Sequence, residues 1–171
     1  MTSRIEIFNG DITQLDVDAI VNAANERLAP GGGVCGAIHR AAGPQLAEAC
    51  RRAGPCPTGE ARITDGFELT ARHVIHAVGP VWHGGTEGED DLLAGAYRSS
   101  LALAKDHGLA SIAFPAISTG IYGYPLERAT GIAVGTAHDW LDDNELPDKV
   151  IFCVFGDAAE RAYAEALAAR R

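Results

Sequence analysis

The sequence predicts an α/β sandwich in which helices cover both faces of one largely parallel sheet. Three observations support this class. Short apolar and β-branched segments alternate along the chain with segments whose apolar residues recur at helical spacing. Some of the short segments, such as residues 150–155, are continuously apolar, which is typical of strands buried on both faces. The 171 residues are 47% hydrophobic and contain no repeat or linker, so we expect a single domain over residues 1–171.

The first third of the chain predicts two strands and two helices. Residues 5–8 are rich in β-forming residue types and end at a turn. Residues 19–21 are short and apolar, and a glycine-rich loop follows them. Residues 37–42 and 44–53 predict two helices separated at Gly43, because the next residue is a proline, which favours the first position of a helix.

The middle of the chain predicts two strands and one long helix. Residues 61–64 and 73–78 are strand candidates, and glycine and proline follow the second. Residues 84–89 predict a polar loop. An amphipathic helix that ends at Gly108 is expected over residues 91–107, because apolar side chains recur there at helical spacing, namely Leu93, Tyr97, Leu101 and Ala104.

A strand, a loop and a helix are predicted next. Residues 111–117 are apolar and predict a buried strand, which runs into a second glycine-containing loop over residues 118–124. Pro125 then opens a predicted helix. One face of that helix is expected to carry Ile132, Thr136 and Trp140.

The end of the chain predicts a strand and a helix. Residues 150–155 form the most apolar segment, and Gly156 ends it. Asp157 and Glu160 then resemble a capping arrangement. A final amphipathic helix follows, with Ala159, Ala162, Tyr163, Ala166 and Leu167 on its apolar face.

Charge and cysteine content exclude several classes of partner. The formal net charge is −9, from 14 Lys and Arg against 23 Asp and Glu, so we expect no general nucleic-acid binding. No apolar run approaches the roughly 20 residues of a membrane helix, so no membrane partner is expected. Four cysteines lack the paired spacing of metal ligands and the amino terminus lacks a secretory apolar core. We therefore expect reduced thiols, a cytoplasmic location, no metal and no cofactor.

The glycine-rich segment 22–36, Asn-Ala-Ala-Asn-Glu-Arg-Leu-Ala-Pro-Gly-Gly-Gly-Val-Cys-Gly, has the composition of an anion site. Glycine allows the backbone to approach a ligand closely, and the first turn of the following helix leaves N–H groups unpaired. Residues 118–124 form a second glycine-containing loop that also follows a predicted strand. Because ligands bind beyond the carboxyl ends of parallel strands, the two loops are expected to enclose a diphosphate. The alternative is that these glycines serve only tight turns.

Two familiar nucleotide sites fit the sequence poorly. Gly31, Gly33 and Gly36 match the spacing of the dinucleotide fingerprint, but the acidic residue that should follow a second strand is missing. Glu48 lies at about that distance, within a predicted helix. No Gly-Lys-Ser or Gly-Lys-Thr occurs, which excludes an ordinary nucleoside-triphosphatase loop.

Four motifs together resemble the macrodomains, and most closely the MacroD-type branch, which includes bacterial O-acetyl-ADP-ribose deacetylases. The motifs are Gly-Asp-Ile-Thr at 10–13, Asn-Ala-Ala-Asn at 22–25, Gly-Gly-Gly-Val-Cys-Gly-Ala-Ile-His-Arg-Ala-Ala-Gly at 31–43 and Pro-Ala-Ile-Ser-Thr-Gly-Ile-Tyr-Gly-Tyr at 115–124. The resemblance covers nearly the whole chain. It implies a three-layer α/β/α sandwich with a mixed sheet, and ADP-ribose or its esters as the ligand.

The resemblance also implies roles at the adenine end of such a ligand. Asp11 would accept a hydrogen bond from the adenine amino group, and the backbone of Ile12 would contact the base. Phe155 would pack against adenine. Two alternatives stay open, since Asp11 is also a common turn residue and Phe155 is also typical of a hydrophobic core.

At the other end, the resemblance implies that Asn25 hydrogen-bonds the distal ribose, where the reaction occurs, and that Tyr124 helps to fix this ribose by packing. Asn22 is expected to bond neighbouring main chain, and His39 is more often structural than catalytic in such a position. Backbone donors from both loops would surround the diphosphate, namely Gly32, Gly33, Val34, Cys35 and Gly36 in the first loop and Ser118, Thr119, Gly120, Ile121 and Tyr122 in the second.

Cys35 departs from the pattern, because catalytic MacroD-type proteins usually carry an aspartate there. An unperturbed thiol is a weak proton acceptor at neutral pH, whereas a carboxylate is not. Three hypotheses follow. Hydrolysis persists, with Asn25 orienting the ribose and the diphosphate holding the water; Cys35 itself reacts as a thiolate; or the chain is a non-catalytic reader of ADP-ribose. We favour the first, an ADP-ribosyl-ester hydrolase that acts on mono-ADP-ribosylated proteins or on O-acetyl-ADP-ribose, with Asn25 and Cys35 as its candidate catalytic residues.

Overall fold

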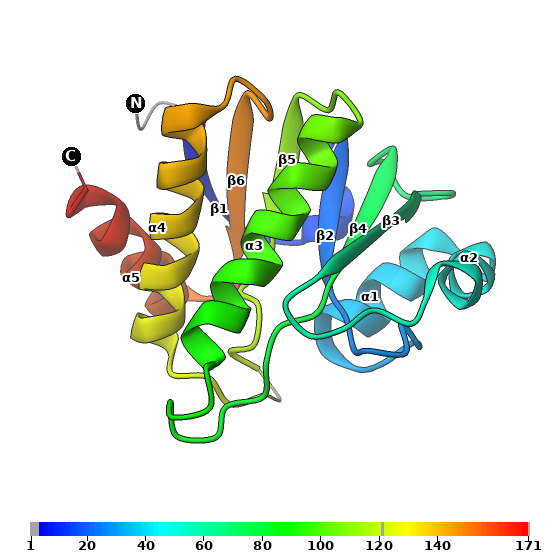
Figure 1. Cartoon of the computed structure of the whole chain (residues 1–171). Coiled ribbons are helices and arrows are strands. Elements are labelled where there is room, and N and C mark those ends of the chain that lie inside the picture. Colours follow the sequence, from blue (N-terminus) through cyan, green and yellow to red (C-terminus); the bar gives the residue numbers. More distant parts are fainter. Residues whose placement is uncertain (1–3, 121, 171) are drawn as a thin grey trace.

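The computed structural model describes residues 4–120 and 122–170, and it shows a three-layer α/β/α sandwich (Figure 1). Its six-stranded sheet has the order β1-β6-β5-β2-β4-β3. The β3–β4 pair is antiparallel and the other neighbouring pairs are parallel, so the sheet is mixed and largely parallel, as expected. The strands are β1 (Ile5–Asn9), β2 (Ala19–Ala23), β3 (Ala61–Asp65), β4 (His73–Ala77), β5 (Ser111–Phe114) and β6 (Lys149–Val154).

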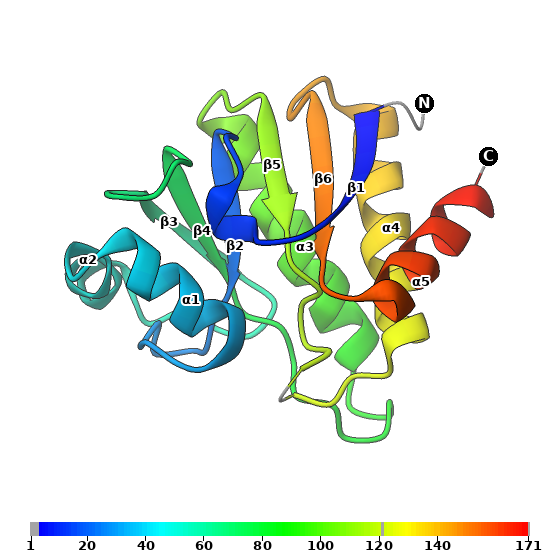
Figure 2. The ribbon, with the colours of Figure 1, turned by 180° about the vertical axis from the view of Figure 1, so that it is seen from behind.

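Helices cover both faces of the sheet. One face packs against α3 (Glu89–Asp106), α4 (Leu126–Asp143) and α5 (Asp157–Ala168). The other face packs against α1 (Gly33–Ala42), α2 (Gln45–Ala53) and the short 3-10 helix η2 (Ile12–Gln14) (Figure 2). Within the described residues, no helix combines the length and apolar character that crossing a membrane requires.

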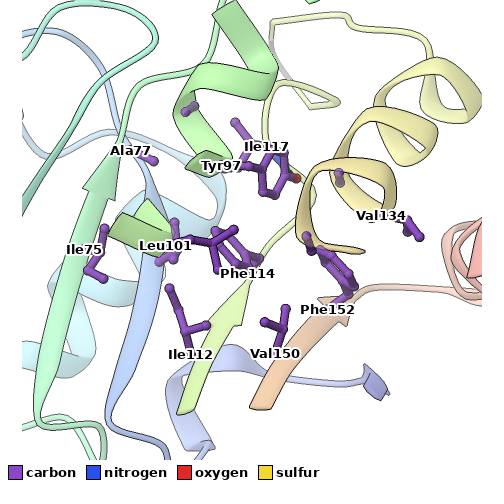
Figure 3. Close-up of a cluster of buried hydrophobic side chains, with 14 of the residues drawn as sticks. Ile75, Ala77, Tyr97, Leu101, Ile112, Phe114, Ile117, Val134, Val150 and Phe152 are labelled. Carbon is purple, nitrogen blue, oxygen red and sulfur yellow. Dashed lines mark hydrogen bonds between the residues drawn. The ribbon is translucent and has the colours of Figure 1, made fainter. Parts of the chain in front are cut away.

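The larger core cluster lies between the sheet and α3, α4 and α5. Phe114 and Phe152 project from neighbouring strands toward Tyr97 of α3, with Phe114 and Tyr97 ring centroids 4.9 Å apart (Figure 3). All three rings are almost completely buried. This aromatic contact fixes α3 over the centre of the sheet, and so it fixes the loops that leave the sheet's carboxyl edge.

We expect Phe114→Ala to lower the free energy of unfolding by about 3–5 kcal/mol, because it removes a buried ring and leaves a cavity. Denaturant unfolding followed by circular dichroism measures this change. Phe155→Ala is the matched control, since that ring is 80% exposed and its removal should leave stability almost unchanged. Equal losses in the two variants would contradict this description of the core.

The ends of several elements differ from the predictions. The predicted strand 111–117 stops at Phe114, because the next residue is a proline, which lacks an N–H for the ladder. The N–H of Ile117 lies 3.4 Å from the hydroxyl of Tyr97 instead. The predicted cap at Asp157 is also wrong, because Gly156 is the N-cap and Asp157 lies in the first turn, where its charge suits the helix dipole.

Two helices differ from the predictions, one in its first residue and the other in the face that it buries. The long helix α3 begins at Glu89, within the predicted loop, because the buried Glu89 carboxylate accepts hydrogen bonds from the backbone of His83, Gly85 and Glu87. Burial alone would raise the pKa of Glu89, but these bonds lower it to about 2. In α4 the predicted face is only half-buried, because a neighbouring stripe with Ala133 and Ala137 packs into the core more closely.

Candidate functional site

The site lies where β2, β4 and β5 end, at the carboxyl edge of the sheet. A central cavity of about 260 Å³ lies there. Its lining comes from both glycine-containing loops and from Gly79, which follows β4, and none of the lining residues carries a charge: Ala23, Ala24, Asn25, Gly31, Gly32, Gly33, Val34, Cys35, Gly79, Ala116, Ile117, Ser118, Gly120 and Tyr122. Any anion in this cavity would therefore be bound by neutral donors.

The first loop is closed by Asn25. Its amide nitrogen donates to the carbonyl of Ala29 and its amide oxygen accepts from the N–H of Ala29, both at 3.0 Å. The chain then turns into α1 at Gly33, whose φ of 57° favours glycine. The first N–H groups of α1, those of Gly33, Val34 and Cys35, have no acceptor within the helix, whereas the N–H of Gly36, also predicted to bind the ligand, donates to the carbonyl of Gly32 at 3.2 Å. The N–H groups without an acceptor are available to a ligand in the cavity.

The second loop follows Pro115 and is held by its own backbone. Tyr124 donates to the carbonyl of Ser118 at 2.9 Å, and Gly123 donates to that of Gly120 at 3.0 Å. Ser118 adopts a φ of 70°, which is unusual for a residue with a side chain. Its buried hydroxyl has no hydrogen-bond partner among the described residues. Such a strained, unpaired group is common in ligand sites. Ile121, a predicted ligand residue, lies outside the described residues.

Tyr124 lies behind this loop rather than in the cavity. It is 2% exposed, and its hydroxyl donates to Asp90. Asp90 also accepts hydrogen bonds from Arg128, whose guanidinium lies over the ring of Trp82, 5.1 Å from its centroid. The ring centroids of Trp82 and Tyr124 are 4.7 Å apart, and the backbone N–H of Trp82 donates to the carbonyl of Tyr122. We call these four residues (Trp82, Asp90, Tyr124 and Arg128) the Asp90 cluster.

The cluster ties the second loop to α3 and α4, so we expect Asp90→Ala to loosen that loop. Affinity for an anionic ligand of the cavity should fall by about tenfold, because a loop that must be ordered on binding lowers the apparent affinity. Calorimetry with a diphosphate ligand measures the loss. Asp91→Ala is the control, since it removes the same charge from the next position, which is exposed and outside the cluster. Unchanged affinity for Asp90→Ala would show that the loop holds its shape without the cluster.

A second hollow of about 230 Å³, the Phe155 hollow, adjoins the central cavity and shares Val34, Ala116 and Gly120 with it. Ile12 and Phe155 are among its lining residues. Phe155 is 80% exposed, so the alternative that it is a core residue is wrong. Asp11 is exposed as well, and one of its carboxylate oxygens caps η2 by accepting from the N–H and hydroxyl of Thr13.

Cys35 lines the central cavity from the first turn of α1. The residue is 5% exposed, and its sulfur lies 3.8 Å from the carbonyl oxygen of Ala29. No Asp or Glu lines the cavity. The Cys35 thiol therefore stands where the resemblance implies an aspartate that could act as a base. The other predicted residues of the first loop, Gly32, Gly33 and Val34, share the cavity with it, and Gly36 lies one residue further along α1.

A comparison with protein-family models identifies the chain. Residues 21–133 match the model described as Macro domain. The chain belongs to the macro domain family. The matched region of this macrodomain contains both glycine-containing loops and the Asp90 cluster.

Relatives are similar over nearly their full length. A macro domain-containing protein of Chlorobaculum tepidum is 60% identical over 165 residues, which cover 96% of both chains. An O-acetyl-ADP-ribose deacetylase of Salmonella gallinarum is 54% identical, with 98% of the macrodomain and 96% of the relative covered. A solved structure of a mutant macrodomain from Oceanobacillus iheyensis with ADP-ribose superposes with a TM-score of 0.93. It is 43% identical and covers 97% of this chain and 92% of its own.

Sequence reasoning missed a buried polar chain beneath the first loop of the macrodomain. Asn22 was expected to bond main chain, but its amide nitrogen lies 3.1 Å from Nδ1 of His76 instead. Nε2 of His76 lies 3.0 Å from the hydroxyl of Thr64, which donates to the carbonyl of Asp65. These contacts match the tautomer with the proton on Nε2, which would donate to the Thr64 hydroxyl while Nδ1 accepts from Asn22. Burial, together with nearby His39, lowers the pKa of His76 to about 3, so the ring is neutral.

His39 and the metal-ligand candidates play no direct part in the cavity. Burial lowers the pKa of His39, which therefore stays neutral at physiological pH, and His39 is absent from the cavity lining. On α4, His138, Asp139 and Asp142 place ligand atoms within 4.8 Å of one another, but they do not line the cavity and both aspartates are exposed.

Proposed function

We propose that this macrodomain binds ADP-ribose and hydrolyses ester bonds at its distal ribose, as an ADP-ribosyl-ester hydrolase. Its substrates would be acidic side chains that carry mono-ADP-ribose, or O-acetyl-ADP-ribose. One observation carries the proposal. Two hollows share lining residues and run from the exposed Phe155 ring, past two loops of backbone donors, to Asn25. A ligand that joins adenine, a diphosphate and a ribose in that order needs an aromatic surface, backbone donors and a polar side chain in the same order.

The uncharged lining supports a diphosphate ligand rather than opposing it. Backbone N–H groups at the start of α1 and in a strained loop form an anion site without any lysine or arginine. That explains how a chain with a net charge of −9 would bind an anion. In this proposal the adenine lies in the Phe155 hollow, whose lining includes Gly10 and Ile12 on either side of Asp11. Asp11 would use its second carboxylate oxygen to accept from the adenine amino group.

Asn25 would orient the distal ribose. Both of its amide atoms already bond Ala29, but the nitrogen carries a second hydrogen and the oxygen a second lone pair. In the reaction, water adds either to the ribose carbon or to the ester carbonyl and loses a proton. The bond between the ribose and the carboxyl group breaks, and the products are a ribose hydroxyl and a carboxylate.

The cavity offers no carboxylate to take the proton from this water, so positioning must supply much of the rate. The bound diphosphate would hold and polarise the water while Asn25 fixes the ribose. The same observation favours a second candidate function, a reader that binds ADP-ribose without turnover. A reactive Cys35 is the least favoured interpretation, because a bound phosphate disfavours a thiolate nearby.

Two measurements on the same protein test the proposal. Calorimetry with free ADP-ribose measures binding, and incubation with a substrate labelled by glutamate-linked mono-ADP-ribose measures release. We expect both binding and release. Binding without release would select the reader function, and the lack of any ADP-ribose binding would refute both.

A further inference from the structure

A third hollow adjoins the central cavity on the side of Asn25. It is a groove of about 450 Å³ whose walls include Glu26, Arg27, Thr58 and Val81. We call it the Arg27 groove. Its lining comes from the segments that follow β2 and β4 and from the segment that precedes β3, so it lies at the same edge of the sheet as the central cavity.

The three hollows follow one another in a definite order. The central cavity shares Val34, Ala116 and Gly120 with the Phe155 hollow, and it shares Asn25, Gly79 and Tyr122 with the Arg27 groove. The Phe155 hollow and the Arg27 groove have no lining residue in common. The central cavity therefore lies between them, and a ligand that fills the first two hollows points its far end at the third.

The Arg27 groove also differs from the other two hollows in charge. The Glu26 carboxylate is held by Thr58, which donates through its N–H at 3.3 Å and its hydroxyl at 2.9 Å. Arg27 is exposed, and within residues 4–120 and 122–170 its guanidinium makes no ion pair or hydrogen bond. Val81 adds an apolar surface that is 42% exposed. The groove thus presents an unpaired cation, a carboxylate that is already held by Thr58, and an apolar patch, at the end where the reacting ribose would lie.

We propose that the Arg27 groove binds the leaving part of the substrate, a polypeptide segment around the acidic side chain that carries ADP-ribose. This inference rests on the proposed function. An acetyl group has only two carbons and would leave a groove of about 450 Å³ almost empty, whereas a peptide would contact Val81 and Thr58. Arg27 would pair with the carboxylate that hydrolysis releases and with neighbouring acidic residues of the peptide.

Binding and turnover are tested separately. The binding probe is a glutamate-containing peptide that carries ADP-ribose through a non-hydrolysable amide linkage, compared with free ADP-ribose by calorimetry. We expect the peptide conjugate to bind about fivefold more tightly than ADP-ribose. Arg27→Ala should remove this gain and leave the affinity for ADP-ribose unchanged, because one partly exposed ion pair contributes up to about 1 kcal/mol.

The matched control is Arg98→Ala, which removes the same charge from an exposed position on α3 outside the groove. A second variant, Val81→Asp, places a negative charge in the groove and should weaken only the peptide conjugate. In turnover, Arg27→Ala should slow hydrolysis of the mono-ADP-ribosylated peptide about fivefold relative to that of O-acetyl-ADP-ribose.

Equal affinity of the wild-type protein for the conjugate and for ADP-ribose would overturn the inference. So would equal effects of Arg27→Ala and Arg98→Ala on binding of the conjugate. A tighter complex with the conjugate but no hydrolysis of either ester would leave the groove assignment standing. That outcome would refute only the hydrolase function.

Discussion

Replacing Cys35 by aspartate is expected to raise the rate of ester hydrolysis by about 10²-fold. A carboxylate can accept a proton from the attacking water, and a general base typically contributes about 10²–10⁴ in rate. The structure favours the change in two ways. The residue lines the central cavity next to Asn25, and it is the third residue of α1, where the helix dipole stabilises a negative charge. The measurement is kcat on a mono-ADP-ribosylated glutamate peptide.

Two further variants separate basicity from shape. Cys35→Asn has nearly the size of the aspartate but no basic group, so its rate should stay close to that of the wild type. Cys35→Ala should retain its affinity for ADP-ribose and much of any hydrolase activity. Equal rates for Cys35→Asp and Cys35→Asn would show that no base acts from this position. An inactive Cys35→Ala with intact binding would instead show that the thiol itself takes part.

The glycine-containing loops could be predicted from the sequence because their chemistry is local. The glycine-rich segment, the asparagines before it and the apolar strand that leads into it are neighbours in the chain, and the structure brings both loops to one cavity. The same holds for the strands, since residues 150–155 form β6 to within one residue at each end. Local pattern was therefore sufficient to predict which segments form the strands and the loops of the site.

Contacts between distant segments could not be predicted in this way. Tyr124 is separated from Asp90 by 34 residues, and no spacing in the sequence indicates that its hydroxyl binds that carboxylate. Asn22 and His76 meet because β2 and β4 are parallel neighbours in register, which is a property of the whole sheet. Phe155 shows the same limit, since an aromatic residue after an apolar strand is as typical of a core as of a ligand surface.

The structure shows which predicted site residues line the two hollows, but contact with a ligand stays a prediction for each of them. Asn25, Val34, Cys35 and Ser118 line the central cavity, and Ile12, Thr119 and Phe155 line the Phe155 hollow. Tyr124 takes a different place from the one the resemblance implies, behind the loop. Tyr122, whose carbonyl accepts from the backbone N–H of Trp82 in the Asp90 cluster, does line the cavity.

Asn25→Ala is expected to reduce turnover by about 10²-fold or more, because the distal ribose would lose the group that orients it for attack. Affinity for ADP-ribose should fall by about fivefold, since a hydrogen bond from an uncharged amide contributes about 1 kcal/mol. Affinity for ADP, which lacks the distal ribose, should fall less, because ADP loses only what Asn25 contributes by closing the first loop. Calorimetry with both ligands and single-turnover hydrolysis measure the three quantities.

The comparison of ADP with ADP-ribose decides how Asn25 acts, because its side chain also closes the first loop through two hydrogen bonds to Ala29. If closing the loop were its only role, Asn25→Ala would weaken ADP and ADP-ribose equally, because both need the backbone donors that follow. Asn22→Ala provides the control. It removes a buried amide that precedes the same loop in the chain, and the cavity lining stays unchanged because Asn22 is not part of it. A selective loss for ADP-ribose in Asn25→Ala alone would place the reacting ribose at this side chain.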